Sequence, residues 1–282
     1  MIRRLAVVGL GLLGGSAALA ARARGLVREI VAVGRRAERL APALADRVVD
    51  RVTTDIAEGV READFVLLAT PVTAIEALLP EVWRSAKTDA VVSDVGSTKR
   101  AIVSAAERLA RSRALAFVGG HPMVGSEQSG YAAARADLFA GATVILTPTE
   151  LTDRLAVKRV SEFWEAVGSR VVALDPDVHD RVVAAVSHLP HLVAFALVDA
   201  VVRLDPSALG FAGRGFADTT RIAASDPEVW RDIFLQNREA LAEMLATFRS
   251  ALEDLERLVA ARDPAGLGAA LARIREMRNA LR

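Results

Sequence analysis

The sequence MIRRLAVVGLGLLGGSAALAARARG, residues 1–25, decides the fold. Its short apolar run from Arg4 to Val8 is typical of a central parallel strand that is buried on both faces. Three glycines follow at once, and small residues then fill the stretch from Leu13 to Arg24, which predicts a helix packed closely against a sheet. The next apolar run, from Glu29 to Val33, predicts a second strand.

The three glycines have the spacing G-x-G-x-x-G, at Gly9, Gly11 and Gly14. Between a strand and a helix, this spacing predicts a dinucleotide-binding turn. The first glycine permits the tight turn, the second the approach of a pyrophosphate group, and the third the contact between helix and sheet. We therefore expect these glycines, with Leu12 and Leu13 between them, to bind a nucleotide. The alternative is a glycine-rich turn without a ligand.

Apolar runs of strand length alternate with segments of helical spacing as far as residue 175. This alternation predicts an open, mostly parallel, doubly wound α/β sheet of the Rossmann type. Helical spacing is clearest at Lys99–Leu109 and Leu155–Ala166. Further strands are expected at Phe65–Ala69, Ala90–Ser93, Ala116–Val118, Thr143–Leu146 and Arg170–Ala173.

The pattern changes near Pro176, beyond which only helical spacing follows. We therefore predict two domains, a dinucleotide-binding domain at residues 1–175 and an all-helical domain at residues 176–282. Long helices of this kind often form a dimer surface as well as a wall of a substrate site. The helices are expected at Val178–Val186, Leu189–Arg203, Pro227–Ala261 and Ala265–Leu281.

The composition excludes several classes of partner. The 282 residues carry 36 basic and 35 acidic side chains, a balance that gives no general attraction to nucleic acid or to anionic membranes. The sequence contains no cysteine, which excludes disulfides, thiolate nucleophiles and thiolate metal sites. No apolar run approaches the ~20 residues of a membrane span. We expect a cytoplasmic protein without a nucleic-acid or membrane partner.

Reactive groups in an open parallel sheet lie just beyond the carboxyl ends of its strands. Ser97, in the sequence DVGSTK of residues 94–99, follows one predicted strand and either caps the next helix or faces the cleft. His121 follows another strand, between two glycines and a proline. This rigid, partly exposed setting favours a general base with a pKa near the reference value of about 6.5. The alternative is a histidine hydrogen-bonded within its loop.

Two further histidines occur in the sequence SHLPH of residues 187–191. Their spacing suggests a metal site, yet no cysteine and no suitably spaced carboxylate pair completes one, so we predict no metal. His188 and His191 fit better as hydrogen-bond donors to an anionic substrate. His179 is flanked by the charged Asp177 and Asp180 and is predicted to lie at the surface.

Asp218 and Arg221 are three residues apart. On a helical turn they can form an ion pair that leaves the guanidinium group pointing at a carboxylate ligand. The competing interpretation is a plain surface ion pair.

Four segments, in this order, together resemble the prephenate and arogenate dehydrogenase family of tyrosine biosynthesis. They are DVGSTK at 94–99, GGHPMVGSEQSG at 119–130, SHLPH at 187–191 and GFADTTRIAASDPEVWRDIF at 215–234. The resemblance implies an oxidative decarboxylation with a nicotinamide cofactor. A hydride leaves the ring carbon that carries the 4-hydroxyl group, the ring carboxylate leaves as carbon dioxide, and the ring becomes aromatic.

The resemblance also implies roles for individual residues. His121 accepts the proton of the substrate hydroxyl, and Ser97 orients that hydroxyl group. Arg221, His191 and Ser187 are the partners of the two substrate carboxylates. An ionic gate covers the cleft, and an aromatic wall comes from the neighbouring subunit of a homodimer. The gate residues are Glu127, Asp218 and Arg221, and the wall is Trp230.

The end of the second predicted strand determines the expected cofactor. Family members that use NAD carry an acidic residue there, whereas this chain has Gly34 followed by Arg35 and Arg36. Two guanidinium groups suit the 2′-phosphate of NADP, so NADP is expected to be preferred over NAD. The alternative is that both arginines are solvated residues at the start of the next helix. Thr70 and Pro71, which follow another strand end, are also expected to contact the cofactor.

Three alternatives remain open. Arogenate dehydrogenase differs only in the amino group on the substrate side chain, and His191 favours the keto acid because its counterpart in arogenate-specific relatives is often apolar. A nucleotide-sensing protein without turnover is disfavoured by the intact Ser97, His121 and Arg221. A reductase of imines or β-hydroxyacids would need a lysine at the start of the second domain, where the sequence has His179 and SHLPH. We therefore expect oxidation of prephenate.

Overall fold

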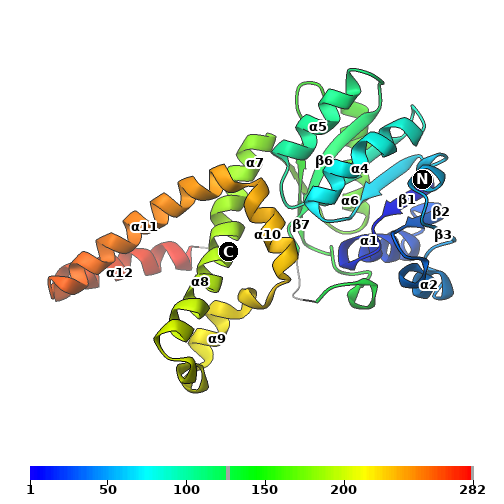
Figure 1. Ribbon diagram of the computed structural model, residues 1–282. Coiled ribbons are helices and arrows are strands. Elements are labelled where there is room, and N and C mark those ends of the chain that lie inside the picture. The colour runs from blue at the N-terminus through cyan, green and yellow to red at the C-terminus, as the bar shows by residue number, and fades with distance from the viewer. Residues whose placement is uncertain (125–127, 281–282) are drawn as a thin grey trace. The chain divides into compact units, whose positions relative to one another are not determined.

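The structure is a computed structural model that describes residues 1–124 and 128–280. Contacts within the chain divide it into two compact units, Met1–Asn237 and Arg238–Arg282. The first unit contains the sheet with its covering helices and also the helices that follow the sheet, through residue 237 (Figure 1).

The first unit is built on one eight-stranded sheet with the order β3-β2-β1-β4-β5-β6-β7-β8. Neighbouring strands from β3 to β6 are parallel, β7 is antiparallel to β6, and β8 is parallel to β7. The predicted open, mostly parallel α/β sheet is therefore confirmed. The strands are β1 (Ile2–Val8), β2 (Val27–Val33), β3 (Arg51–Thr53), β4 (Phe65–Leu68), β5 (Val91–Asp94), β6 (Ala116–Pro122), β7 (Thr143–Thr147) and β8 (Arg170–Ala173).

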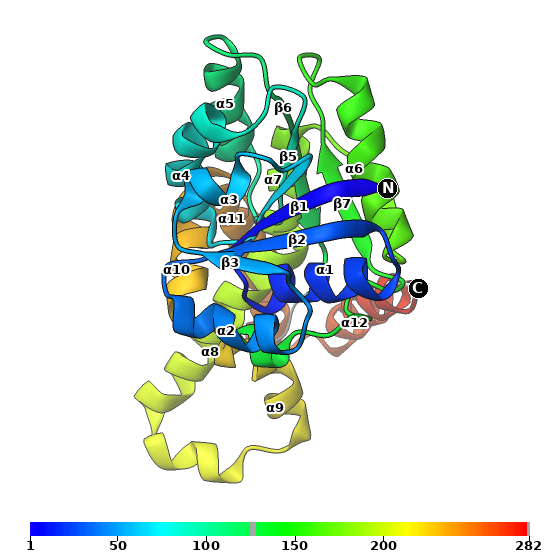
Figure 2. The ribbon, with the colours of Figure 1, turned by 90° about the vertical axis from the view of Figure 1, so that its right-hand side faces the viewer.

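Helices cover both faces of this sheet (Figure 2). Strand β1 is buried on both sides, as its apolar run predicts. Its Leu5 and Val7 belong to a core with Trp164 of α6, whereas Ala6 and Val8 belong to a second core under α3, α4 and α5. The covering helices are α1 (Leu12–Ala23), α2 (Ala37–Ala45), α3 (Ile56–Val60), α4 (Val72–Ser85), α5 (Arg100–Ala110) and α6 (Arg154–Ala166).

The helices after the sheet differ in three places from the sequence prediction, one of which is the short helix Arg214–Thr220 that was not predicted. The helix that starts at Pro176 continues to Leu204 through one wide π turn, so SHLPH lies inside a helix rather than at its start. The helix expected from Pro227 to Ala261 is interrupted at Asn237, a buried residue. The elements are α7 (Pro176–Val183), the π turn (Ala184–His188), α8 (Leu189–Leu204), α9 (Arg214–Thr220), a 3₁₀ turn (Arg221–Ala224) and α10 (Pro227–Gln236).

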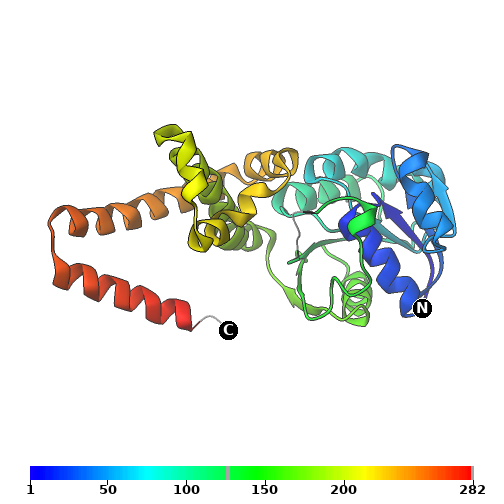
Figure 3. The same ribbon diagram turned by 90° about the horizontal axis from the view of Figure 1, so that it is seen from below.

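The second unit consists of α11 (Arg238–Ala260) and α12 (Pro264–Asn279), joined by a short turn (Figure 3). The Asp263 side chain caps α12 by accepting a hydrogen bond from the Gly266 amide at 2.9 Å. Large apolar side chains of both helices remain exposed in the single chain. They are Leu252, Val259, Leu271, Ile274 and Met277.

Among the described residues, the helix Pro176–Leu204 is long and apolar enough to cross a membrane, judged by length and composition alone. The expectation that no apolar segment approaches this length is therefore not met. Only 28% of its most apolar window is buried in the chain. An apolar helix face that the chain itself does not cover is typical of a surface that contacts another molecule.

The glycine turn after β1 has the geometry that its spacing predicts. Gly9 has a φ of 98°, which favours glycine. A Cβ atom on Gly14 would lie 2.0 Å from the carbonyl oxygen of Gly9, so only glycine allows α1 to pack on the turn. A Cβ atom on Gly11 would meet no atom within 4 Å. Gly14 therefore has a packing role, and Gly11 faces open space.

This difference predicts opposite effects of the same substitution. Gly14→Ala should lower the thermal unfolding midpoint of the cofactor-free protein by at least ~3 °C, because overpacking costs about 1–3 kcal/mol. Gly11→Ala, its matched control, should leave that midpoint within about 1 °C. Scanning calorimetry of both variants tests this, and an unchanged midpoint for Gly14→Ala would contradict the packing role.

Candidate active site

Four strand ends lie side by side along one edge of the sheet. Strands β1, β4, β5 and β6 are neighbours in that order and run parallel, so their carboxyl ends meet at this edge. The residues at these ends are Gly9, Thr70, Ser97 and His121. The topology therefore gathers the glycine turn and both predicted catalytic residues at one edge.

His121 lies at the end of β6 and is 8% exposed. Its Nδ1 atom is 2.9 Å from Nε2 of His179, and the two rings meet edge to face. Burial lowers the pKa of His121 well below its ordinary value of 6.5, and charge on His179 or Lys99 would lower it further. The expected pKa near the reference value is therefore wrong, and the ring is a neutral base at neutral pH.

His179, in α7, is completely buried, so its predicted surface position is wrong. Its Nδ1 atom lies 2.8 Å from Oδ1 of Asp180. The Asp180 carboxylate also accepts hydrogen bonds from the backbone amides of Lys99 and Arg100 at 2.8 and 3.0 Å. The hydrogen bonds from these amides at the start of α5 stabilise the charged Asp180 in a buried position. The local sequence around Asp180 does not reveal this contact. The adjacency of His179 and Asp180 is the one sequence signal that could have indicated this arrangement, but charged neighbours favoured a surface position instead.

Ser97 is half-buried in the loop between β5 and α5. It does not cap α5, because the Asp180 carboxylate occupies that position. Its hydroxyl has no hydrogen-bond partner among the residues that the structure describes. The capping role considered for Ser97 is therefore wrong, and its hydroxyl is available to a ligand.

A buried ion pair fixes the backbone beside His121. The Lys99 ammonium, 0% exposed, contacts the Asp94 carboxylate and donates a hydrogen bond to the Gly120 carbonyl at 3.0 Å. Asp94 in turn accepts the Gly120 amide hydrogen bond at 3.1 Å. No local sequence pattern predicts this pair, which ties β5 and α5 to the residue preceding the histidine.

The SHLPH segment contains the π turn, a feature that is frequent at functional sites. His191 donates its Nδ1 hydrogen to the Ser187 carbonyl at 2.9 Å and stacks on the Trp230 ring, with centroids 3.5 Å apart. Burial lowers the pKa of His191, and the Arg221 charge adds to this effect. Trp230 thus contacts a histidine of its own chain.

His188 completes a group that contains all four histidines of the sequence. Its Nδ1 atom accepts a hydrogen bond from the Asn237 amide at 3.0 Å, and the same amide donates to the Asp180 carbonyl at 2.8 Å. Burial lowers the pKa of His188 to about 4. Its Nε2 atom is buried and has no hydrogen-bond partner in the described part of the chain.

The structure describes two of the three residues that the resemblance assigns to an ionic gate. Arg221 begins the 3₁₀ turn after α9, near enough to His191 to affect its pKa. Asp218 is exposed and does not pair with Arg221, so the predicted ion pair between these two described residues is absent. Glu127 lies outside the described residues.

The glycine turn fits a pyrophosphate-containing cofactor. Gly11 opens α1 and faces open space, while Leu12 and Leu13 are half-buried behind it. Next to Gly9, the Oγ1 atom of Thr70 is buried without a hydrogen-bond partner among the described residues, and Pro71 is exposed beside it. An open helix N-terminus beside an unsatisfied hydroxyl is suited to a phosphate group.

The end of β2 carries the two arginines on which the cofactor prediction depends. Gly34 is half-buried, and Arg35 and Arg36 are exposed before α2. Neither guanidinium group forms an ion pair with any other described residue. Both are therefore available to an anionic group.

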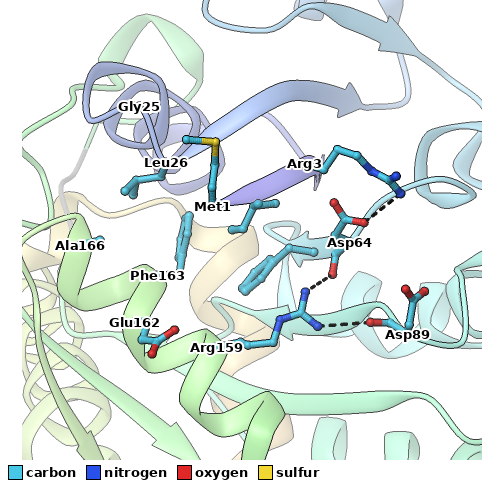
Figure 4. A pocket seen from close by; sticks show the side chains of 12 residues that line it. Met1, Arg3, Gly25, Leu26, Asp64, Asp89, Arg159, Glu162, Phe163 and Ala166 are labelled. Carbon is cyan, nitrogen blue, oxygen red and sulfur yellow. Dashed lines mark hydrogen bonds and ion pairs between the residues drawn. The ribbon is translucent and has the colours of Figure 1, made fainter.

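A separate hollow of about 820 Å³ lies at the opposite, amino-terminal edge of the sheet, between the starts of β1 and β4 and helix α6 (Figure 4). Its charged groups already have partners. Arg3 pairs with Asp64, and Arg159 donates to the backbone oxygens of Asp64 and Asp89. This hollow contains none of the candidate site residues.

Two family profiles together match most of the chain. The profile described as "Prephenate dehydrogenase, nucleotide-binding domain" matches residues 17–173. The profile described as "Prephenate dehydrogenase, dimerization domain" matches residues 175–273.

Individual relatives agree with these profiles. Prephenate dehydrogenase of Bacillus subtilis is 39% identical over 84% of this chain, which spans 65% of that protein. Cyclohexadienyl dehydrogenase of Zymomonas mobilis is 34% identical over 93% of this chain and 90% of its own length.

Among solved structures, prephenate dehydrogenase from A. aeolicus in complex with hydroxyphenyl propionate and NAD+ aligns with a TM-score of 0.94 at 36% identity, covering 100% of this chain and 99% of the other. Synechocystis arogenate dehydrogenase aligns with a TM-score of 0.84 at 31% identity, covering 98% and 99%. The gathered strand ends, the buried histidines and these matches lead to one conclusion: the chain belongs to the prephenate dehydrogenase family.

Proposed function

We propose that the chain oxidises prephenate to 4-hydroxyphenylpyruvate and carbon dioxide with a nicotinamide cofactor. The observation that carries this proposal is the neutral His121 at the same sheet edge as the open glycine turn. A bound nicotinamide supplies the hydride acceptor. Membership of a family of nicotinamide-dependent dehydrogenases supports the same chemistry.

His121 moves one proton twice in this scheme. It accepts the proton of the substrate hydroxyl while the hydride leaves the same carbon. Loss of carbon dioxide then leaves a phenolate, whose reference pKa of about 10 far exceeds that of the histidine. The imidazolium therefore returns the proton to the phenolate oxygen. The hydroxyl of Ser97, which has no hydrogen-bond partner in the described part of the chain, is proposed to orient the substrate hydroxyl.

The substrate carboxylates are proposed to bind Arg221, His191 and Ser187. Because Nδ1 of His191 already donates to the Ser187 carbonyl, His191 must be protonated at Nε2 to donate to a carboxylate. A bound anion raises the pKa of His191 and so opposes burial and the Arg221 charge, which lower it. Trp230 positions the His191 ring by stacking on it. Glu127 and Asp218 are proposed to belong to an ionic gate over the cleft.

The assembly and location are also proposals. The functional domains are proposed to be residues 1–175 and 176–282, which agrees with the family profiles that meet between residues 173 and 175. Exposed apolar side chains on α8, α11 and α12, within a dimerization-domain match, support a homodimer rather than membrane insertion. We propose a cytoplasmic dimer, which a mass of 30.0 kDa in solution would contradict.

NADP is proposed as the preferred cofactor. The two exposed arginines after β2 form no ion pair with another described residue and suit a 2′-phosphate. The three residues directly after β2, at positions 34–36, include no carboxylate to repel that phosphate or to bind the ribose hydroxyls.

Replacement of the base tests the proposed mechanism. His121→Asn should lower kcat with prephenate by about 10²–10⁴, with little change in the dissociation constant of the cofactor. In the unmodified enzyme, activity should be lost as pH falls through the His121 pKa, because the neutral ring is the active form. Since burial lowers that pKa, this acid limb should lie below pH 6.5. An acid limb above pH 7, or near-normal turnover of His121→Asn, would contradict the assignment.

Arg221→Ala tests the substrate side. Loss of a charge-assisted contact of about 1.5–3 kcal/mol should raise the KM for prephenate roughly tenfold or more. Arg214→Ala, which removes an exposed arginine from the start of α9, serves as the matched control and should change KM less than twofold, roughly. Equal effects of the two variants would exclude a specific role for Arg221.

The cofactor proposal is tested by Gly34→Asp combined with Arg35→Ala. The new carboxylate should bind the ribose hydroxyls and repel the 2′-phosphate, so the ratio of kcat/KM should move from NADP toward NAD. Arg28→Ala, at the opposite end of β2, is the control and should leave the ratio unchanged. An unmodified enzyme that already favours NAD would refute the proposal.

A further inference from the structure

Asp180, His179 and His121 form a buried chain of hydrogen bonds. The geometry of this chain determines which ring nitrogen of each of the two histidines carries a hydrogen. Asp180 accepts two backbone hydrogen bonds, and together with His179 these lower the pKa of its carboxyl group. An ionised carboxylate only accepts, so His179 must carry its hydrogen on Nδ1.

The tautomer of the second ring follows from the first. With hydrogen on Nδ1, a neutral His179 presents a lone pair at Nε2, and only a donor can occupy the 2.9 Å contact made there by His121. His121 must therefore carry its hydrogen on Nδ1. Its Nε2 atom is then unprotonated and has no partner among the described residues.

We propose that His179, anchored by Asp180, is a positioning residue that selects the Nδ1–H tautomer of His121 and keeps Nε2 as the basic atom. The part that concerns substrate rests on the proposed function, whereas the tautomer itself does not. Without His179, His121 would have no acceptor for its Nδ1 hydrogen at this contact.

The hydrogen-bond chain from Asp180 to His121 also explains how the buried His121 ring accepts a proton. When Nε2 of His121 takes the substrate proton, its Nδ1 proton can move to Nε2 of His179. His121 is then neutral again, and the positive charge lies on the ring that contacts Asp180. Other charged or titratable groups around the two rings are Asp94, which favours this charge, and Lys99 and His188, which oppose it.

Nitrogen NMR of protein labelled with [¹⁵N]histidine tests the tautomer directly, since the sequence has four histidines and His121→Asn identifies one of them. We expect a protonated Nδ1 and an unprotonated Nε2 for His121. In His179→Phe, which removes the acceptor, His121 should shift toward the Nε2–H form. A His121 ring protonated at Nε2 in the unmodified protein, or one unaffected by His179→Phe, would overturn the proposal.

Kinetics add a readout that a merely structural role would not give. His179→Phe should lower kcat at least tenfold with little change in KM or in the cofactor dissociation constant. His179→Gln, whose side-chain oxygen can accept the Nδ1 hydrogen, should recover part of that loss. Equal losses in both variants would contradict the positioning role. If the NMR result holds but neither the unmodified protein nor its variants turn over prephenate, the proposed function fails and the tautomer assignment stands.

Discussion

The hydrogen bonds of the Asp180 carboxylate hold the candidate site together. This one group caps α5 through two backbone amides and contacts His179, so it joins the helices after the sheet to the carboxyl edge of the sheet. A buried carboxylate is costly unless its hydrogen-bonding capacity is used. Here three donors use it, and His121 is positioned as a consequence.

Burial gives this site its electrostatic character. The rings of His121, His179 and His188 are nearly inaccessible to water, and burial lowers the pKa of each. A general base must be unprotonated to work, and this environment keeps it so over a wider pH range than water would. The Lys99–Asp94 pair adds rigidity, because it holds both polar backbone groups of Gly120.

Local sequence patterns were sufficient for seven of the eight strands of the sheet and for the strand-end residues. The apolar run of β1 and the glycine spacing predicted the strand, the turn and α1 within about two residues, because strand burial and tight turns restrict which residues fit. The position of His121 beyond a predicted strand followed from the same topology. Strand β3 was missed because its three residues at a sheet edge, one exposed and two half-buried, give no periodic signal.

Contacts between distant segments could not be predicted in this way. His179 appears solvent-exposed from its charged neighbours, and only the amides of residues 99 and 100, some 80 positions earlier, make its burial favourable. The break at Asn237 has a similar origin, since its side chain bonds to Asp180 and His188 rather than to its own helix. In both cases a tertiary contact overrides a local preference.

The most direct test of the account is the stoichiometry of turnover by the purified protein. Prephenate supplied with NADP should yield one carbon dioxide for each cofactor reduced, with arogenate under the same conditions a much poorer substrate. Cofactor binding without reduction by either compound would contradict the account and would indicate a nucleotide-binding protein that lacks this activity.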